Sequence, residues 1–191
     1  MQKRNLPVVL ISLFTMCLLA LPGLSCGADL LTESDEYKDK EFVKGVIEDY
    51  SDMKEGGDIS WVWIDPNVKL AGNKIKISSF VNKSSMRKKS LTTTVDKIFN
   101  DAFGDIETNG NKGTLTTNCA IYMAELANMS KVWIPFVGMH KAQAGIGVEM
   151  VFMNNKGKVV AKIRHTAREG LEIEKAAEEA ADDIVKFIMR N

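Results

Sequence analysis

Residues 146–163, IGVEMVFMNNKGKVVAKI, decide the fold of this chain of 191 residues. Apolar side chains recur at every second position, which is typical of a β-strand with one buried face. They are Ile146, Val148, Met150 and Phe152. Residues 154–157 supply turn residues, and Val159–Ile163 can form the return strand. The segment therefore predicts a β-hairpin.

Three segments upstream predict further strands. Ile59–Ile64 is rich in aromatic and β-branched residues and ends before Pro66, because proline cannot continue a strand ladder. Lys74–Phe80 alternates polar and apolar residues, so we expect one half-buried strand there. Leu115–Leu126 is also a strand candidate, although its end tolerates a helix.

Two segments carry the periodicity of an amphipathic helix. The first follows Ser90, a suitable N-cap residue, and stops at Gly104. Its apolar face is Leu91, Val95, Ile98, Phe99, Ala102 and Phe103. The second lies at the C-terminus, with the face Ile173, Ala177, Ala180, Ile184, Phe187 and Ile188. These elements predict an α/β (α+β) fold, a two-layer sandwich. We expect a four- to five-stranded mixed or antiparallel sheet with two amphipathic helices on one face.

The N-terminus predicts export from a bacterial cell. Lys3 and Arg4 precede Leu6–Leu21, a nearly uncharged apolar stretch. Its length suits the core of a signal peptide better than a membrane span, which needs about 20 apolar residues. Pro22 and Gly23 then break the helix.

The next residues, Leu24-Ser25-Cys26, resemble the lipobox of bacterial lipoproteins. The resemblance implies that a diacylglyceryl group is joined to the sulfur of Cys26 and that cleavage precedes this cysteine. Acyl chains there would hold the protein on the membrane. Gly23 departs from the pattern, because that position usually carries a branched aliphatic residue. An ordinary signal peptidase could instead cut after Ser25 or Ala28, which leaves an unlipidated exported protein as the alternative.

The leader divides the chain into three parts. We expect a signal peptide at residues 1–25, a lipidated N-terminus with a flexible tether at 26–41, and a single globular α/β domain at 42–191. An arm that packs on the domain is the alternative for the tether, because Leu30-Leu31 is apolar. Gly27 follows the cysteine, and by resemblance to enterobacterial sorting rules this favours the outer membrane, facing the periplasm.

Four segments together resemble known bacterial lipoproteins. DYSDMK at 49–54, WVWIDP at 61–66 and the strand at 75–81 resemble the opening of the domain-of-unknown-function family numbered thirty-three thirteen. GIGVEMV at 145–151, with the hairpin and the last helix, is similar to the related family numbered forty-four ten. Met53 stands where the first pattern prefers leucine. The resemblance implies a fold and a compartment, and it names no chemistry.

Composition excludes several classes of function. The whole chain has 25 basic and 25 acidic residues, and loss of Lys3 and Arg4 with the leader leaves the mature chain near −2, so its net charge does not attract nucleic acid. The two histidines, His140 and His165, lack the spacing of a zinc site, and no phosphate-binding loop or nucleophile elbow is present. We expect no enzyme activity, no cofactor and no metal.

Two local features are candidates for contacts with other molecules. A basic cluster before the first mature helix would bind an anion, a lipid head group or an acidic partner, or would be a solvated loop. Its members are Lys83, Arg87, Lys88 and Lys89. An apolar segment would be an interaction patch or a buried connection. Its large side chains are Trp133, Phe136 and Met139.

The sequence therefore predicts a lipid-anchored periplasmic module that binds or assembles envelope components without catalysis. Its expected partners are the membrane, through the lipid, and an unidentified envelope protein. The alternative is a soluble periplasmic small-ligand binder or a cryptic hydrolase, whose pocket would gather Asp49, Tyr50 and His165. For residues 49–51 themselves, the sequence favours a turn in which Tyr50 packs and Asp49 or Ser51 caps backbone groups. If Cys26 carries lipid, we expect Cys119 to be a small buried hydrophobe. If Cys26 carries no lipid, the two cysteines could form a disulfide.

Overall fold

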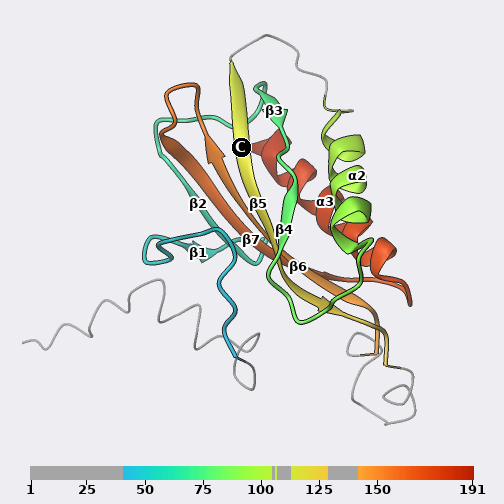
Figure 1. Ribbon diagram of the computed structural model, residues 1–191. Coiled ribbons are helices and arrows are strands. Elements are labelled where there is room, and N and C mark those ends of the chain that lie inside the picture. Colours follow the sequence, from blue (N-terminus) through green and yellow to red (C-terminus); the bar gives the residue numbers. More distant parts are fainter. Residues whose placement is uncertain (1–40, 105, 107–112, 129–141) are drawn as a thin grey trace, which may run out of the picture.

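The computed structural model describes residues 41–104, 106, 113–128 and 142–191 (Figure 1). A mixed sheet of seven strands has the order β1-β2-β7-β6-β5-β3, and β4 also pairs with β5. The strands are β1 (Lys54–Glu55), β2 (Trp61–Ile64), β3 (Lys74–Lys76), β4 (Phe80–Asn82), β5 (Thr114–Glu125), β6 (Gly145–Met153) and β7 (Val159–Arg168). The helices are α2 (Leu91–Gly104) and α3 (Ile173–Arg190). The α+β class and the two helices agree with the sequence prediction, whereas the sheet has more strands than the four or five expected.

The predicted hairpin is confirmed as the antiparallel pair β6 and β7 at the centre of the sheet. Its turn is closed by a hydrogen bond from Asn154 N–H to the Lys158 carbonyl, 3.0 Å. Gly157 has a φ of 75°, a conformation that glycine adopts without strain. Strand β7 runs on to Arg168, five residues beyond the predicted end at Ile163.

The two helices lie side by side on one side of the sheet (Figure 1). Alternate side chains of the central strands point at them, including Ile146, Val148 and Ile163, none of which is exposed to solvent. Helix α2 buries Leu91, Val95, Phe99 and Phe103, four of the residues on the predicted face. The main hydrophobic core therefore lies between the helices and this face of the sheet. Neither helix of the described residues combines the length and hydrophobicity needed to cross a membrane.

The prediction of a single strand at Lys74–Phe80 is wrong, because the structure has two short strands there, β3 and β4. Lys76 pairs with Thr116, and Phe80 pairs with Cys119. The segment from Lys76 to Phe80 therefore contains one more residue than the stretch of β5 that it pairs with. The extra residue forms an irregularity of the kind seen in β-bulges, which turns Phe80 towards the core. The short strand β1 was missed altogether, since two residues are too few to show a periodicity.

No helix of the described residues lies on the other face of the sheet, and a chain segment covers part of this face. We call residues 41–53 the strap and this side of the sheet the helix-free face. A second, smaller cluster of buried side chains lies between them: Ile47, Tyr50, Met53, Trp61, Tyr122 and Val151. The ring of Phe42 also packs edge-on against Tyr50, with centroids 5.2 Å apart.

Candidate functional site

The strap is fastened to the sheet by the buried carboxylate of Glu149. Its Oε2 accepts hydrogen bonds from the backbone N–H groups of Val46 (2.7 Å) and Ile47 (3.0 Å). Its Oε1 accepts from the hydroxyl of Tyr50 (2.8 Å) and from Nη1 of Arg164. Glu149 and Arg164 lie opposite each other on β6 and β7, and both side chains are fully buried. A buried ion pair of this kind needs such additional hydrogen bonds, because removing two charges from water is costly.

Aromatic rings complete the surroundings of the Arg164 guanidinium. It lies 3.4 Å from the ring centroid of Tyr122 and 4.5 Å from that of Phe42. Its Nη1 also donates to the carbonyl of Val43, 3.1 Å away. Gly147 makes room for this arrangement, because a Cβ there would lie 2.5 Å from the ring of Tyr122. These contacts fix the first half of the strap against β6 and β7.

The predicted turn at residues 49–51 is confirmed. Asp49 Oδ1 accepts a hydrogen bond from the N–H of Ser51, 2.9 Å away, and this bond lowers the pKa of Asp49. Tyr50 is buried, and burial, followed by the negative charge of Glu149, raises the pKa of its hydroxyl. Tyr50 therefore stays neutral and donates a hydrogen bond to Glu149, which fastens the strap to the sheet.

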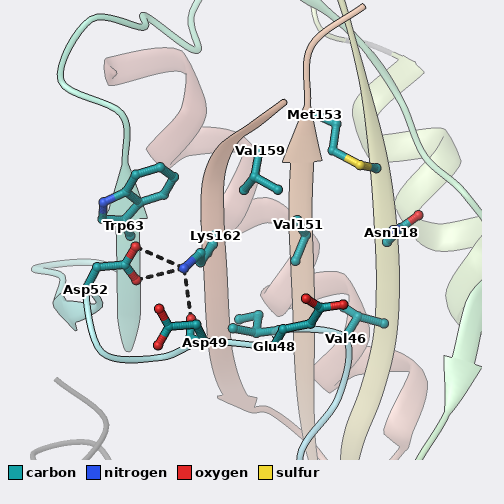
Figure 2. Close-up of a pocket in the computed structure, with 11 residues that line it drawn as sticks. Val46, Glu48, Asp49, Asp52, Trp63, Asn118, Val151, Met153, Val159 and Lys162 are labelled. Atoms are coloured by element: carbon teal, nitrogen blue, oxygen red, sulfur yellow. Dashed lines mark hydrogen bonds and ion pairs between the residues drawn. The ribbon is translucent and has the colours of Figure 1, made fainter. Parts of the chain in front are cut away.

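A groove of about 430 Å³ lies on the helix-free face, bounded by the second half of the strap (Figure 2). Strands β2, β7, β6 and β5 and the strap all supply side chains to it. The apolar lining residues are Val46, Ile47, Trp63, Val151, Met153 and Val159, and the polar ones are Glu48, Asp49, Asp52, Asn118 and Lys162. We refer to this hollow as the groove.

Lys162 is the cation of the groove, and its charge is engaged inside the protein. Its Nζ lies 2.8 and 2.9 Å from the two carboxylate oxygens of Asp52 and 2.8 Å from the carbonyl of Asp49 (Figure 2). It also lies 5.2 Å from the ring centroid of Trp63. The other carboxylates of the lining, Glu48 and Asp49, belong to exposed residues. The groove therefore offers an apolar floor beside an acidic rim.

The predicted basic cluster lies on the loop between β4 and α2 and contributes nothing to the groove. All four residues are exposed. Lys88 forms an ion pair with Glu174 of α3 (3.1 Å), and Arg87 Nη1 donates to the Ser84 carbonyl (3.3 Å). At least these two members therefore make contacts within the protein.

Other predicted positions lie outside the described residues. They are the lipid attachment residue Cys26, the signal peptide at 1–25, the tether up to residue 40, the patch of Trp133, Phe136 and Met139, and His140. Cys119 is described as a free, buried cysteine. Burial raises the pKa of its thiol to about 12.

His165 is separated from Asp49 and Tyr50 by the sheet. Because neighbouring residues of a strand point to opposite faces, Arg164 points to the helix-free face and His165 to the helices. His165 Nε2 lies 3.2 Å from Asp183 of α3, and its Nδ1 accepts from the N–H of Ser60 at 3.3 Å. The hypothetical pocket of Asp49, Tyr50 and His165 is therefore not formed.

Ser60, His165 and Asp183 are residue types that also serve in serine hydrolases, and here they contact one another. Ser60 Oγ lies 3.3 Å from His165 Nδ1 and accepts from the N–H of Thr166 at 3.2 Å. None of the three lines the groove. Together they join α3 to β7 and to the start of β2. Across the described ranges, no group of three or more His, Cys, Asp or Glu side chains is arranged to hold a metal ion.

Sequence reasoning missed Glu149 and Arg164. The signal for Glu149 was present, because an acidic residue in a strand as apolar as GIGVEMVFM requires a partner if the strand is buried on both faces. The identity of its partners could not be read from the sequence, since Val46, Ile47 and Tyr50 lie about 100 residues upstream.

No protein-family model and no curated protein matches the chain. The two resemblances to domain-of-unknown-function families are therefore not confirmed. Solved structures give distant likenesses. Two PelC dodecamers from Paraburkholderia phytofirmans, one with a single substitution, are each 11% identical and match 67% of this chain. Their TM-scores are 0.47 and 0.45, over 95% and 94% of the PelC chains.

A third solved structure is a protein from Caulobacter crescentus described as a "putative lipoprotein". It is 16% identical, with a TM-score of 0.32 over 63% of this chain and 90% of that one. A protein described in these words is thus among the distant structural neighbours, and these values are too low to assign a family or a function.

Proposed function

We propose that this protein is a lipoprotein of the bacterial cell envelope and that its domain binds another envelope component without catalysis. The groove on the helix-free face carries the binding part of the proposal. Helices cover one face of the sheet, whereas the other face keeps an open hollow with a floor of Trp63, Val151 and Met153. A hollow with an apolar floor and a few polar groups is the usual form of a binding site.

The chemistry of the groove favours binding over catalysis. Among the described residues that line it there is no histidine, cysteine or serine that could act as a nucleophile or as a base near neutral pH. The lowered pKa of Asp49 keeps its carboxylate charged and makes it a poor proton donor. Lys162 is held by Asp52, so it is not available as an amine nucleophile.

The leader carries the anchoring part of the proposal. Lys3, Arg4 and the apolar stretch Leu6–Leu21 lead to the lipobox-like residues that end at Cys26. Acylation there would hold the domain at the membrane, with about 0.8 kcal/mol contributed by each buried methylene. Gly27 after the cysteine favours the outer membrane by resemblance to enterobacterial sorting.

The anchor is tested by the mass of the N-terminal peptide of the native protein, isolated from membrane and soluble fractions. We expect a lipid-sized addition on Cys26 in the membrane fraction, and we expect Cys26→Ala to leave the protein unlipidated. An unmodified N-terminus at Cys26 or Asp29 would contradict the lipoprotein assignment and would favour a soluble periplasmic protein.

The binding surface is tested by a photo-crosslinking amino acid placed at single positions in cells. Asn118 and Met153 line the groove, whereas Glu179 is an exposed residue of α3 in the helix layer and serves as the matched control. We expect one discrete adduct from the groove positions and none from position 179. Equal crosslinking from all three positions would contradict a binding role of the groove.

A further inference from the structure

We propose that the groove binds a segment of a partner protein in which a lysine or arginine side chain stands beside apolar side chains. This inference rests on the proposed function, because it specifies what the same groove binds. It follows from the negative charge of the lining carboxylates, from the width of the apolar surface beside them, and from the fact that both belong to the same groove.

The rim of the groove has an excess of negative charge. Three carboxylates line it, from Glu48, Asp49 and Asp52, against the single cation of Lys162. The ion pair of Lys162 with Asp52 neutralises one of them, at 2.8 Å. Glu48 and Asp49 are exposed residues without an ion pair to Lys162, and the lowered pKa of Asp49 keeps it ionised. A positive group on the partner would therefore be attracted to these two carboxylates.

The floor of the groove is wider than one side chain. Trp63 stands on β2, Val159 on β7, and Val151 and Met153 on β6. Neighbouring strands are about 4.8 Å apart, so these three strands span about 10 Å. A small cation would leave this apolar surface exposed to water, whereas two or three side chains of a peptide segment would cover it.

Both features must be satisfied by the same ligand. An acidic segment would be repelled by Glu48 and Asp49, and a purely apolar segment would bury these carboxylates without a partner. The exposed lysines of β3, Lys74 and Lys76, lie on the far side of β5 and outside the lining. A basic and apolar segment is therefore the ligand that the groove accepts best.

The test uses the mature chain, residues 26–191 with Cys26→Ser, so that its result does not depend on lipid attachment. Two peptides of equal length are titrated by NMR, acetyl-Leu-Lys-Val-Arg-Leu-amide and acetyl-Leu-Glu-Val-Glu-Leu-amide. We expect the basic peptide to shift signals of groove residues such as Asn118 and Met153. Raising the salt from about 0.05 M to about 0.5 M should weaken its binding several-fold, because salt screens the attraction.

Charge-neutral variants supply the matched comparison. Glu48→Gln with Asp49→Asn should weaken binding of the basic peptide about tenfold, since two attractive charges are lost. Glu179→Gln with Asp182→Asn removes the same charge from exposed positions of α3 and should leave the affinity unchanged. Met153→Thr should weaken binding without changing its dependence on salt.

Two results would overturn the inference: equal binding of both peptides, or no shift of groove signals by the basic peptide. Crosslinking of a partner at Asn118 or Met153 in cells would then leave the proposed function intact, with a ligand of different chemistry. Absence of lipid on Cys26 would instead remove the anchor and leave the peptide result standing.

Discussion

At the scale of single residues, Glu149 and Arg164 determine how the helix-free face is closed. The carboxylate accepts hydrogen bonds from two strap N–H groups and from Tyr50, and it pairs with the guanidinium. Both side chains are fully buried. Such a pair adds little net stability compared with apolar residues of the same volume, whereas losing one partner leaves a buried charge without its counter-ion.

We therefore predict that Glu149→Leu lowers the free energy of unfolding by about 3 to 5 kcal/mol. Arg164→Leu added to Glu149→Leu should recover part of this loss, because no charge then remains buried. Urea denaturation followed by circular dichroism measures both. Glu125→Gln is the control, since its pair with Arg168 is partly exposed and should contribute at most about 1 kcal/mol. A double variant less stable than Glu149→Leu would contradict this account.

Asp65 gives a prediction about pH. A hydrogen bond from Lys158 Nζ (2.7 Å), followed by one from the N–H of Asn67 (3.0 Å), lowers its pKa to about 2. Its unfolded pKa is about 3.9, so the charged form is favoured by folding. The stabilisation is complete above about pH 4 and disappears as the pH falls through about 2.

Asp65→Asn should accordingly be less stable than the wild type at pH 6, and the difference should shrink towards pH 2. Urea denaturation midpoints at several pH values between these limits measure it. Asp182→Asn, on the exposed side of α3, should show no such convergence. A difference that is the same at all pH values would show that Asp65 acts through packing and not through its charge.

At the scale of elements, the edge of the sheet depends on Thr117 of β5. Its hydroxyl lies beside the irregularity between β3 and β4, where the backbone ladder is interrupted. It donates to the carbonyl of Lys76 at 3.2 Å and accepts from the N–H of Ser78 at 3.1 Å. The side chain thus replaces a backbone partner for both groups.

Thr117→Val keeps the shape of the side chain and should lower the free energy of unfolding by about 1 to 2 kcal/mol, because two backbone groups lose their partner. Thr116→Val is the same change at the neighbouring, exposed position and should have an effect within about 0.5 kcal/mol. Chemical denaturation of both variants measures the difference. Equal effects would mean that the hydroxyl of Thr117 does not hold the edge.

At the scale of the whole molecule, the helices cover one face of the sheet and the strap covers part of the other. The helices are held by many more buried side chains than the strap. The helix layer contributes many buried side chains, from Leu91 in α2 to Ile188 in α3. The strap contributes a smaller cluster, and Glu149 accepts backbone hydrogen bonds from only two of its residues, Val46 and Ile47. The strap is also the wall of the groove and the segment that follows the predicted tether.

We predict that the amides of Val46, Ile47 and Tyr50 exchange with solvent through openings of lower free energy than the amides of β6 and β7. Native-state hydrogen exchange at low urea concentrations measures both. Strap amides that exchange only by global unfolding would contradict this prediction.

The sequence alone was sufficient where structure depends on local periodicity. Alternation identified the hairpin of β6 and β7, and a helical period of apolar side chains identified α2 and α3. It also indicated which side of each element is apolar. The sequence was insufficient for the edge strands β3 and β4. One extra residue between Lys76 and Phe80 shifts their pairing with β5, but it does not alter the alternation of polar and apolar residues enough to be seen.

The leader predicted at residues 1–25 likewise rests on the sequence, because charge, length of the apolar stretch and small residues can be read in order along the chain. The tertiary structure alone decided the partners of Glu149, the separation of His165 from Tyr50 and the composition of the groove. Strap and strand lie about 100 residues apart in the chain. Periodicity determines which face of a strand a side chain occupies, and only the folded chain determines what lies opposite it.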